Sequence, residues 1–315
     1  MSKLAFIFPG QGSQSVGMGK DVHDQSETAR SIFEAADEKL GMKLSEIMFE
    51  GPQETLTLTY NAQPALLTAS TAILSKFREN GISPDYAAGH SLGEYSALVA
   101  SGVLSFEDAV YAVRKRGEYM NEAVPAGIGA MAAIMGMDAD ALKSVTEEVT
   151  ASGFSVQLAN LNCPGQIVIS GTAEGVEKAS ALAKEKGAKR AIALDVSGPF
   201  HSELMKPAAE KFAAVLAELE VNDAAIPAVA NVTAKPVADK NEIKRLLVEQ
   251  LYSPVRWEES VREMIDQGVT VFVEIGPGKV LSGLVKKIDR SAEVIAVSDM
   301  ASFEAAVQKL KEVQL

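Results

Sequence analysis

Short apolar runs alternate with longer amphipathic stretches along most of the chain. The short runs predict buried strands, at residues 4–8, 85–88, 228–232, 269–275 and 293–297. The longer stretches carry apolar residues at helical spacing and predict helices at 22–40, 61–80, 92–100, 106–124, 202–219, 242–252, 255–267, 279–287 and from about 302 onward. Because strands alternate with helices, we predict an α/β fold whose sheet is mainly parallel and covered on both faces.

The pattern changes near Pro125-Ala126-Gly127. The next stretch predicts strand, helix, strand, strand, helix and strand, at 131–135, 139–150, 155–160, 166–170, 173–186 and 190–194. This βαββαβ order is typical of a ferredoxin-like unit. We therefore predict an inserted ferredoxin-like subdomain at 126–198, within a discontinuous core formed by 1–125 and 199–315.

Composition and charge narrow the possible classes of function. The chain has 315 residues and a formal net charge of -12, which argues against nucleic-acid binding because neutralising phosphates requires a basic face. The one cysteine, Cys163, excludes an intrachain disulfide and suits a reducing compartment. No apolar run reaches about 18 residues, and the run at 4–8 is too short for a signal peptide. We expect a cytoplasmic protein with no membrane span.

One pentapeptide, Gly89-His90-Ser91-Leu92-Gly93, fits the pattern G-x-S-x-G between a predicted strand and a predicted helix. In this pattern a serine sits on a sharp turn, and the flanking glycines remove Cβ atoms that would collide. The following helix directs its N-terminus at the hydroxyl, where negative charge develops in acyl transfer. The motif alone also fits a glycine-rich turn whose serine is a helix N-cap.

The loop from Gly10 to Gly19 is dense in glycine but lacks the known phosphate-binding spacings. Ser15 stands where G-x-G-x-x-G requires a third glycine, and Met18 follows Gly17 where a P-loop requires lysine. We therefore predict no nucleotide site in this loop. An ordered loop can still present backbone N–H groups to an anion, and the alternative is a plain connection.

A serine nucleophile needs a base, and the chain holds three histidines. His23 lies among aspartates on a helix and is expected to be solvated. His90 is adjacent to Ser91, so its side chain should point away from the serine. His201 lies in a loop that enters a helix and is the remaining candidate for the base. The alternative for His201 is an ordinary surface histidine.

A hydrolase triad would place an acid between Ser91 and His201 in the chain. Asp138, Asp140 and Asp195 fall in that interval, and none is convincing. Asp138 and Asp140 belong to the predicted insert, and Asp195, near the end of that insert, is too close to His201 in sequence. We therefore expect a dyad in which a neutral group, such as a backbone carbonyl or an amide, orients the imidazole.

The helix at 106–124 carries three consecutive basic residues. With Val113 at the centre of the apolar face, Lys115 points to water, Arg114 lies on the flank, and Arg116 lies about 60° from the centre. A guanidinium at this edge is partly desolvated and suits bidentate binding of a carboxylate. Gly117 beside it permits close approach of another backbone. The alternative for Arg116 is an ion pair with an Asp or Glu of the chain.

With these residues in hand, the chain resembles the acyltransferase family of fatty acid and polyketide synthesis, which includes malonyl-CoA:acyl carrier protein transacylases. The matching stretches occur in the family's order over nearly the full length, at 8–14, 63–65, 89–95, 116–117, 162–166, 198–202, 253–257 and 274–278. The resemblance implies a hydrolase-like α/β core with an inserted ferredoxin-like subdomain.

The resemblance also implies roles for the catalytic residues. Ser91 is the nucleophile that carries the acyl group, and His201 takes its proton and later returns it. The backbone N–H groups of Gln11 and Leu92 form the oxyanion hole. The backbone carbonyl of Gln250 orients His201 in place of an acid.

For the substrate, the resemblance implies a malonyl group bound through its free carboxylate by Arg116. Gln63 lines the pocket, and Asn160 and Asn162 contact the pantetheine or coenzyme side. The implied reaction is a ping-pong transfer from malonyl-CoA to acyl carrier protein through malonyl-Ser91. Coenzyme A is then a substrate and no cofactor is needed. We expect no metal, no nucleic acid and a monomer.

Alternatives remain open at this point. A serine esterase or thioesterase would use the same Ser91 and His201, a polyketide-pathway acyltransferase would use a different carrier, and a non-catalytic carrier-binding protein would form no acyl-enzyme. Carrier proteins are acidic, so docking on this acidic chain would need a local basic patch. The candidate residues are Lys184, Lys186, Lys189, Arg190, Lys286, Lys287 and Arg290.

Overall fold

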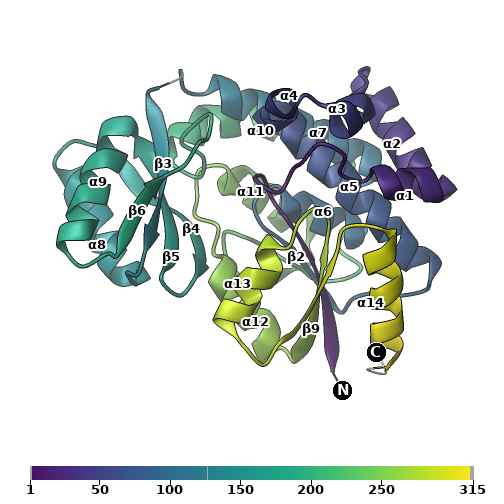
Figure 1. Ribbon diagram of the computed structural model, residues 1–315. Helices are drawn as coiled ribbons and strands as arrows, with labels where there is room; N and C mark the ends of the chain where they lie inside the picture. The colour runs from purple at the N-terminus through teal and green to yellow at the C-terminus, as the bar shows by residue number, and fades with distance from the viewer. Residues whose placement is uncertain (1, 126, 313–315) are drawn as a thin grey trace.

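Two β-sheets organise the chain in the computed structural model, which describes residues 2–125 and 127–312. One sheet has six strands in the order β10-β9-β1-β2-β7-β8, and the other has four in the order β4-β5-β3-β6. Figure 1 shows the four-stranded sheet and its helices, in teal, as a separate lobe beside the larger one. The fold is therefore α/β with a parallel sheet and a second, antiparallel sheet.

The six-stranded sheet is parallel at every pairing except β7 with β8. Its strands are β1 Lys3–Phe8, β2 Tyr86–Gly89, β7 Ala228–Val229, β8 Pro236–Val237, β9 Val269–Ile275 and β10 Glu293–Val297. The prediction of a mainly parallel sheet is confirmed. The strand predicted at 228–232 is shorter, because the chain leaves the sheet after Val229 and turns back to form β8, which was not predicted.

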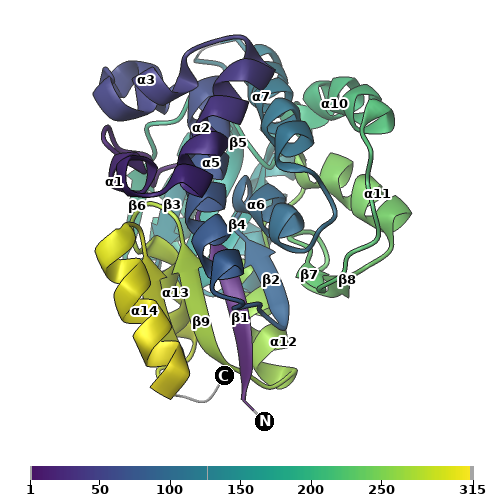
Figure 2. The same cartoon turned by 90° about the vertical axis from the view of Figure 1, so that its right-hand side faces the viewer.

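Alternate residues of β1 pack into different cores. Phe6 and Phe8 join the large core on one face of the sheet, whereas Ala5 and Ile7 join a smaller core on the other face. Since both faces are covered, nearly every residue of the strand is apolar and buried. Figure 2 shows helices in front of the sheet, including α5 and α6, while α14 packs beside β10, the strand at one edge of the sheet.

The core helices lie on both sides of this sheet. They are α1 Lys20–Gln25, α2 Glu27–Leu40, α3 Leu44–Glu50, α4 Gln53–Thr57, α5 Thr59–Glu79, α6 Gly93–Ala100, α7 Phe106–Glu122, α10 Lys206–Glu218, α11 Lys240–Gln250, α12 Trp257–Asp266, α13 Val280–Ile288 and α14 Met300–Glu312. Helices α3 and α4 are short and were not predicted. No helix in the described part of the chain is long and apolar enough to cross a membrane.

Two predicted helices are corrected in detail. The helix predicted at 22–40 is two helices, α1 and α2, because the chain is extended at Ser26 and its hydroxyl caps α2 by accepting from the Ala29 N–H at 3.2 Å. The helix predicted at 202–219 begins with a separate 3₁₀ turn at Glu203–Met205, and α10 follows it.

Helix α5 begins two residues earlier than predicted, so Pro64 lies beyond its first turn. Proline has no N–H to donate to the carbonyl four residues back, which is that of Tyr60. This carbonyl instead accepts from Arg114 Nη1 at 3.0 Å. Helix α7 thus supplies the hydrogen bond that the proline removes from α5.

The second sheet belongs to a continuous βαββαβ segment. Its elements are β3 Gly129–Met135, α8 Ala139–Ala151, β4 Val156–Cys163, β5 Gln166–Thr172, α9 Ala173–Glu185 and β6 Arg190–Ala193. The predicted element order is confirmed, although β4 extends to Cys163. All its strand pairs are antiparallel. Ala126, the first residue of the predicted subdomain, lies outside the described residues, as do 313–315.

Candidate active site

Ser91 sits on a strained turn between β2 and α6. Its φ is 50°, which is the left-handed region that few residues other than glycine adopt. A Cβ at Gly89 would overlap the backbone of Gly93, and a Cβ at Gly93 would overlap the carbonyl of Phe8. The two glycines are thus required by close backbone approach, as the motif predicts. Ser91 does not cap α6, which has no side-chain cap, so the N-cap alternative is wrong.

His201 contacts Ser91 although it lies 110 residues later in the chain, after the βαββαβ segment. Its Nε2 lies 2.7 Å from Ser91 Oγ, and its Nδ1 lies 2.8 Å from the carbonyl oxygen of Gln250. Because a carbonyl only accepts, Nδ1 carries the proton and Nε2 presents a lone pair to the serine. Burial, with the Arg116 cation nearby, lowers the pKa of His201 to about 3. The imidazole is therefore neutral and able to accept the serine proton.

The other histidines lie in different surroundings. His23 contacts Asp24 and packs against the rings of Phe33 and Phe49, with 25% of its side chain exposed, so it is solvated only in part. His90 Nε2 lies 2.7 Å from Asn162 Oδ1, and no hydrogen bond joins it to Ser91 in the described part of the chain.

The acids considered for a triad do not take part in one. Asp138 caps α8 by accepting from the Ala141 N–H. Within residues 2–125 and 127–312, no carboxylate hydrogen-bonds to His201. The imidazole is held by the Gln250 carbonyl, as expected for a dyad oriented by a neutral group.

Arg116 is buried beside the serine, with 1% of its surface exposed. It donates from Nη1 to Gln63 Oε1 at 2.7 Å, and from Nη2 to Ser91 Oγ at 3.1 Å and Gln250 Oε1 at 2.9 Å. Its Nε has no hydrogen-bond partner among the described residues. Since no ion pair joins it to a described carboxylate, the structure does not support the ion-pair alternative. The site therefore holds a buried cation that contacts no carboxylate of the described chain.

The neighbours of Arg116 follow the helical prediction. Lys115 extends partly into solvent and pairs with Glu118, and Arg114 lies on the flank. A Cβ at Gly117 would lie 2.6 Å from Tyr60 Cα, so this glycine lets α5 and α7 approach closely. That approach brings Gln63 of α5 against Arg116.

Two residues near Ser91 have backbone N–H groups without a partner in the described chain. Gln11 lies in the loop after β1, and Leu92 follows the serine, and both line the cavity that holds Ser91. In the described chain neither N–H has a backbone or side-chain acceptor. They are therefore free to donate to an oxyanion.

The cavity around Ser91 has a volume of about 180 Å³ and lies between the two lobes. The core contributes Gln11, Arg116 and Met120, and the insert contributes Met131 and Asn160. Asn160 is thus placed on the wall, whereas Asn162 contacts His90. The site is small and polar at one end.

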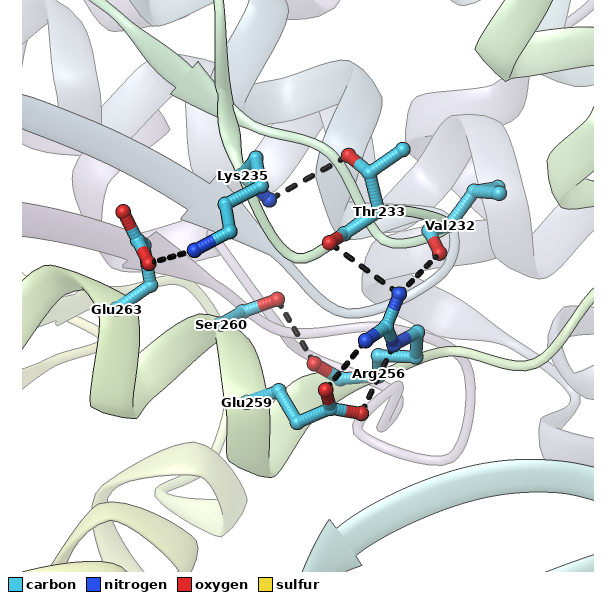
Figure 3. A network of polar contacts seen from close by, with 7 residues as sticks. All are labelled: Val232, Thr233, Lys235, Arg256, Glu259, Ser260 and Glu263. Atoms are coloured by element: carbon cyan, nitrogen blue, oxygen red, sulfur yellow. Dashed lines mark hydrogen bonds and ion pairs between the residues drawn. The ribbon is translucent and has the colours of Figure 1, made fainter.

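Asn231 was not predicted from the sequence, and its side chain holds the Ser91 turn through two hydrogen bonds. Its Oδ1 accepts from the Ser91 N–H at 2.8 Å, and its Nδ2 donates to the Gly89 carbonyl at 2.7 Å. The available signal was its place just beyond β7, since functional side chains gather at the carboxyl ends of parallel strands. In Figure 3, Arg256 fixes the loop after Asn231 by donating to the carbonyls of Val232 and Thr233.

Comparison with known proteins supports one family. Residues 5–311 match the family model described as acyl transferase domain. A malonyl CoA-acyl carrier protein transacylase from Bacillus subtilis (strain 168) is 67% identical over 312 residues, or 99% of this chain and 98% of that protein. One of the same description from Staphylococcus aureus (strain MRSA252) is 47% identical over 300 residues, or 95% of this chain and 97% of that protein.

Solved structures agree with these sequence matches. A crystal structure of an acyl carrier protein S-malonyltransferase from Vibrio cholerae has 49% identity and a TM-score of 0.95, and covers 97% of this chain and 100% of that chain. A structure described as a type II PKS acyl-carrier protein in complex with its malonyl-transacylase has 46% identity and a TM-score of 0.95, and covers 98% and 100% of the two chains.

Proposed function

The chain belongs to the acyl transferase family, and we propose that it transfers a malonyl group from malonyl-CoA to the phosphopantetheine thiol of an acyl carrier protein, for fatty acid synthesis. The observation that carries the choice of acyl group is Arg116. This cation is buried next to the nucleophile and contacts no described carboxylate. A buried cation with no carboxylate in direct contact favours a ligand that brings its own carboxylate.

In the first half-reaction, Ser91 Oγ attacks the thioester carbonyl while His201 Nε2 takes the hydroxyl proton. The oxyanion of the tetrahedral intermediate accepts from the N–H groups of Leu92 and Gln11. The C–S bond then breaks, and coenzyme A leaves with the proton from His201. The malonyl group is left as an ester on Ser91.

In the second half-reaction, the carrier thiol gives its proton to His201 Nε2 and attacks the ester carbonyl. The C–O bond breaks, and Ser91 recovers the proton. A thiol held in the cleft outcompetes water by proximity, and the small cavity limits water around the ester. The reaction needs no cofactor or metal, since coenzyme A enters only as part of the donor.

Arg116 would hold the malonyl carboxylate through charge-assisted hydrogen bonds, with Gln63 and Gln250 fixing its plane. A cavity of about 180 Å³ suits a short acyl group. Of the weaker assignments, Asn160 on the wall fits a contact with the pantetheine, whereas Asn162 would act through His90.

The acyl carrier protein would dock on the insert near β6. Lys189 and Arg190 line a hollow of about 750 Å³ that also includes Glu258 of the core. Lys287 reaches across from the core to Gln166 Oε1 at 3.1 Å. Lys186 is paired with Glu148 and is a weaker candidate. Reversing the charges of Lys189 and Arg190 should raise KM for the carrier and leave KM for malonyl-CoA unchanged.

We further infer that the core is hydrolase-like and that 126–198 is a ferredoxin-like subdomain, with the core formed by 1–125 and 199–315. The strand order β4-β5-β3-β6 with two helices supports the second description. The buried free thiol of Cys163 fits a reducing cytoplasm. The cytoplasmic location and the monomeric state stay predictions.

The direct test is intact mass after incubation with malonyl-CoA. The wild-type protein should gain one malonyl adduct, and Ser91→Ala should gain none. Ser96→Ala is a matched control, because Ser96 lies on α6, which directly follows the Ser91 turn, and its buried hydroxyl has no partner in the described residues. An adduct on Ser91→Ala would refute the nucleophile.

Assays of the wild-type protein also distinguish the proposed transferase from the esterase, the non-catalytic binding protein and the polyketide acyltransferase. Release of free malonate without transfer to a thiol would favour an esterase, and the absence of a triad acid among the described residues counts against one. No adduct on the wild type would favour a non-catalytic binding protein. Comparing fatty acid and polyketide carrier proteins as acceptors identifies the pathway.

A further inference from the structure

A buried carboxylate, that of Glu94, lies beneath the active site and takes no part in the mechanism above. It occupies the first turn of α6, three residues after Ser91, and is 3% exposed. Its Oε2 accepts from Gln250 Nε2 at 2.7 Å and from the Asn231 N–H at 3.1 Å. No Lys, Arg or His in the described chain forms an ion pair with it. Both of its partners are groups that hold the nucleophile turn or the imidazole.

The Gln250 amide joins this carboxylate to the Arg116 cation. Its Nε2 faces acceptors, namely Glu94 Oε2, the Ser91 carbonyl at 3.0 Å and Asn231 Oδ1 at 3.2 Å. Its Oε1 faces the Arg116 Nη2 donor at 2.9 Å. A flipped amide would place its oxygen against the carboxylate and its NH₂ against the guanidinium. The contacts therefore permit one orientation of the amide.

Glu94 supplies the strongest of the acceptors that fix this orientation, because hydrogen bonds to a carboxylate are charge-assisted. Without it, the Gln250 NH₂ would retain two neutral acceptors, and the amide oxygen would be held at Arg116 less strongly. Two opposite charges, neither in direct contact with the other, are thus coupled through one polarised amide.

We propose that Glu94 is a positioning residue that, through the Gln250 amide, holds the Arg116 guanidinium at Ser91 and so sets the preference for an acyl group that carries a carboxylate. The proposal rests on the proposed function, in which Arg116 binds that carboxylate. It differs from a purely structural role for Glu94, because it predicts an effect that depends on the acyl donor.

The experiment compares transfer from malonyl-CoA and acetyl-CoA to the carrier protein, at about pH 8, where His201 is neutral. Glu94→Leu removes the acceptor, and the ratio of kcat/KM for malonyl over acetyl should fall by roughly tenfold or more, the effect of one charge-assisted hydrogen bond. Glu94→Gln can keep an oxygen at the same place, and its ratio should stay within about threefold of the wild type. Thermal unfolding of each variant reports whether it is folded.

An unchanged ratio in Glu94→Leu, with both donors slowed equally, would overturn the proposal, as would a loss in Glu94→Gln equal to that in Glu94→Leu. If Glu94→Leu does not fold, Gln250→Met gives the same test from the other side. It removes the amide but keeps the backbone carbonyl that binds His201. Its ratio should fall, and an unchanged ratio would overturn the proposal.

Measuring the wild type and Arg116→Ala in the same assay distinguishes failure of the proposed function from failure of the proposed role of Glu94. If the wild type does not prefer malonyl, or if Arg116→Ala leaves the preference intact, the proposed function fails. If Arg116→Ala abolishes the preference while Glu94→Leu and Gln250→Met retain it, the role of Glu94 alone fails. A fall in the ratio for all three variants supports both.

Discussion

Replacing Arg116 with alanine removes the one buried cation that touches Ser91 in the described chain. The guanidinium already donates to Gln63, Gln250 and Ser91, and its Nε is unused. The bound malonyl carboxylate would take charge-assisted hydrogen bonds from this group. The acetyl group has no carboxylate and loses none of them.

The magnitude follows from those bonds. Each charge-assisted hydrogen bond contributes about 1.5–3 kcal/mol, and part of the gain offsets loss of solvation of the carboxylate. We therefore expect a net loss of about 2–4 kcal/mol for malonyl transfer, which is about 30- to 900-fold in kcat/KM. Acetyl transfer should change much less, because only the contact between Arg116 Nη2 and Ser91 Oγ is lost.

The assay measures transfer from both donors to the carrier protein at about pH 8. This pH matters because Arg116 helps to lower the pKa of His201, and its removal lets that pKa rise. At pH 8 the His201 imidazole stays neutral in the wild type and in Arg116→Ala, so its protonation does not contribute to the difference between their rates. Lys115→Ala is the matched control, since this neighbouring side chain is partly exposed and pairs with Glu118. Equal losses for malonyl and acetyl in Arg116→Ala would refute the reasoning and make Arg116 structural.

The remaining predictions concern pH and packing. Since the pKa of His201 is lowered to about 3, its neutral form persists far below pH 6.5, and single-turnover acylation by acetyl-CoA, the donor that does not depend on Glu94, should keep its rate at pH 5.5; a midpoint near 6.5 with this donor would contradict this. Burial raises the pKa of Glu94 from 4.5 to about 7, so the folded protein binds this proton more tightly than the unfolded chain. The wild type should therefore lose stability relative to Glu94→Gln as pH rises from 4.5 through 7, by up to about 3 kcal/mol in urea unfolding, and a constant difference would be evidence against it. Gly117→Ala should destabilise the protein by about 1–3 kcal/mol, because its Cβ would lie 2.6 Å from Tyr60 Cα. Gly283→Ala on α13 meets open space and should be neutral or slightly stabilising, so equal effects of the two would show that crowding against α5 is not the cause.

The sequence predicted those parts of the site that depend on local geometry. The glycines at 89 and 93 indicate a tight turn whatever the tertiary packing around it. The position of Arg116 on its helix likewise places it at the edge of the buried face. The roles of Gln11 and Gln250 came from the resemblance, because a backbone N–H or carbonyl carries no signal in the sequence. Their positions are compatible with those roles.

Asn231 and Glu94 could not be predicted in this way. Asn231 reaches the Ser91 turn because the chain leaves the sheet after the two residues of β7, and nothing local fixes that point. An acidic residue in the first turn of a helix, such as Glu94, usually indicates a favourable interaction with the helix dipole. Its burial and its contact with Gln250 appear only when α6 and α11 are packed together.

The insert is joined to the core by more than the two ends of its chain. Strand β4 forms a parallel bridge with the loop before α12, in which the Val255 N–H donates to the Ala159 carbonyl at 2.8 Å and the Leu161 N–H donates to the Val255 carbonyl at 2.9 Å. This bridge flanks Asn160 on the cavity wall. The segment from β3 to β6 therefore cannot be exchanged between relatives by itself. A chimaera that exchanges this segment between relatives must also exchange the loop at 253–257. Otherwise it will lose the backbone bridge that flanks Asn160 on the cavity wall.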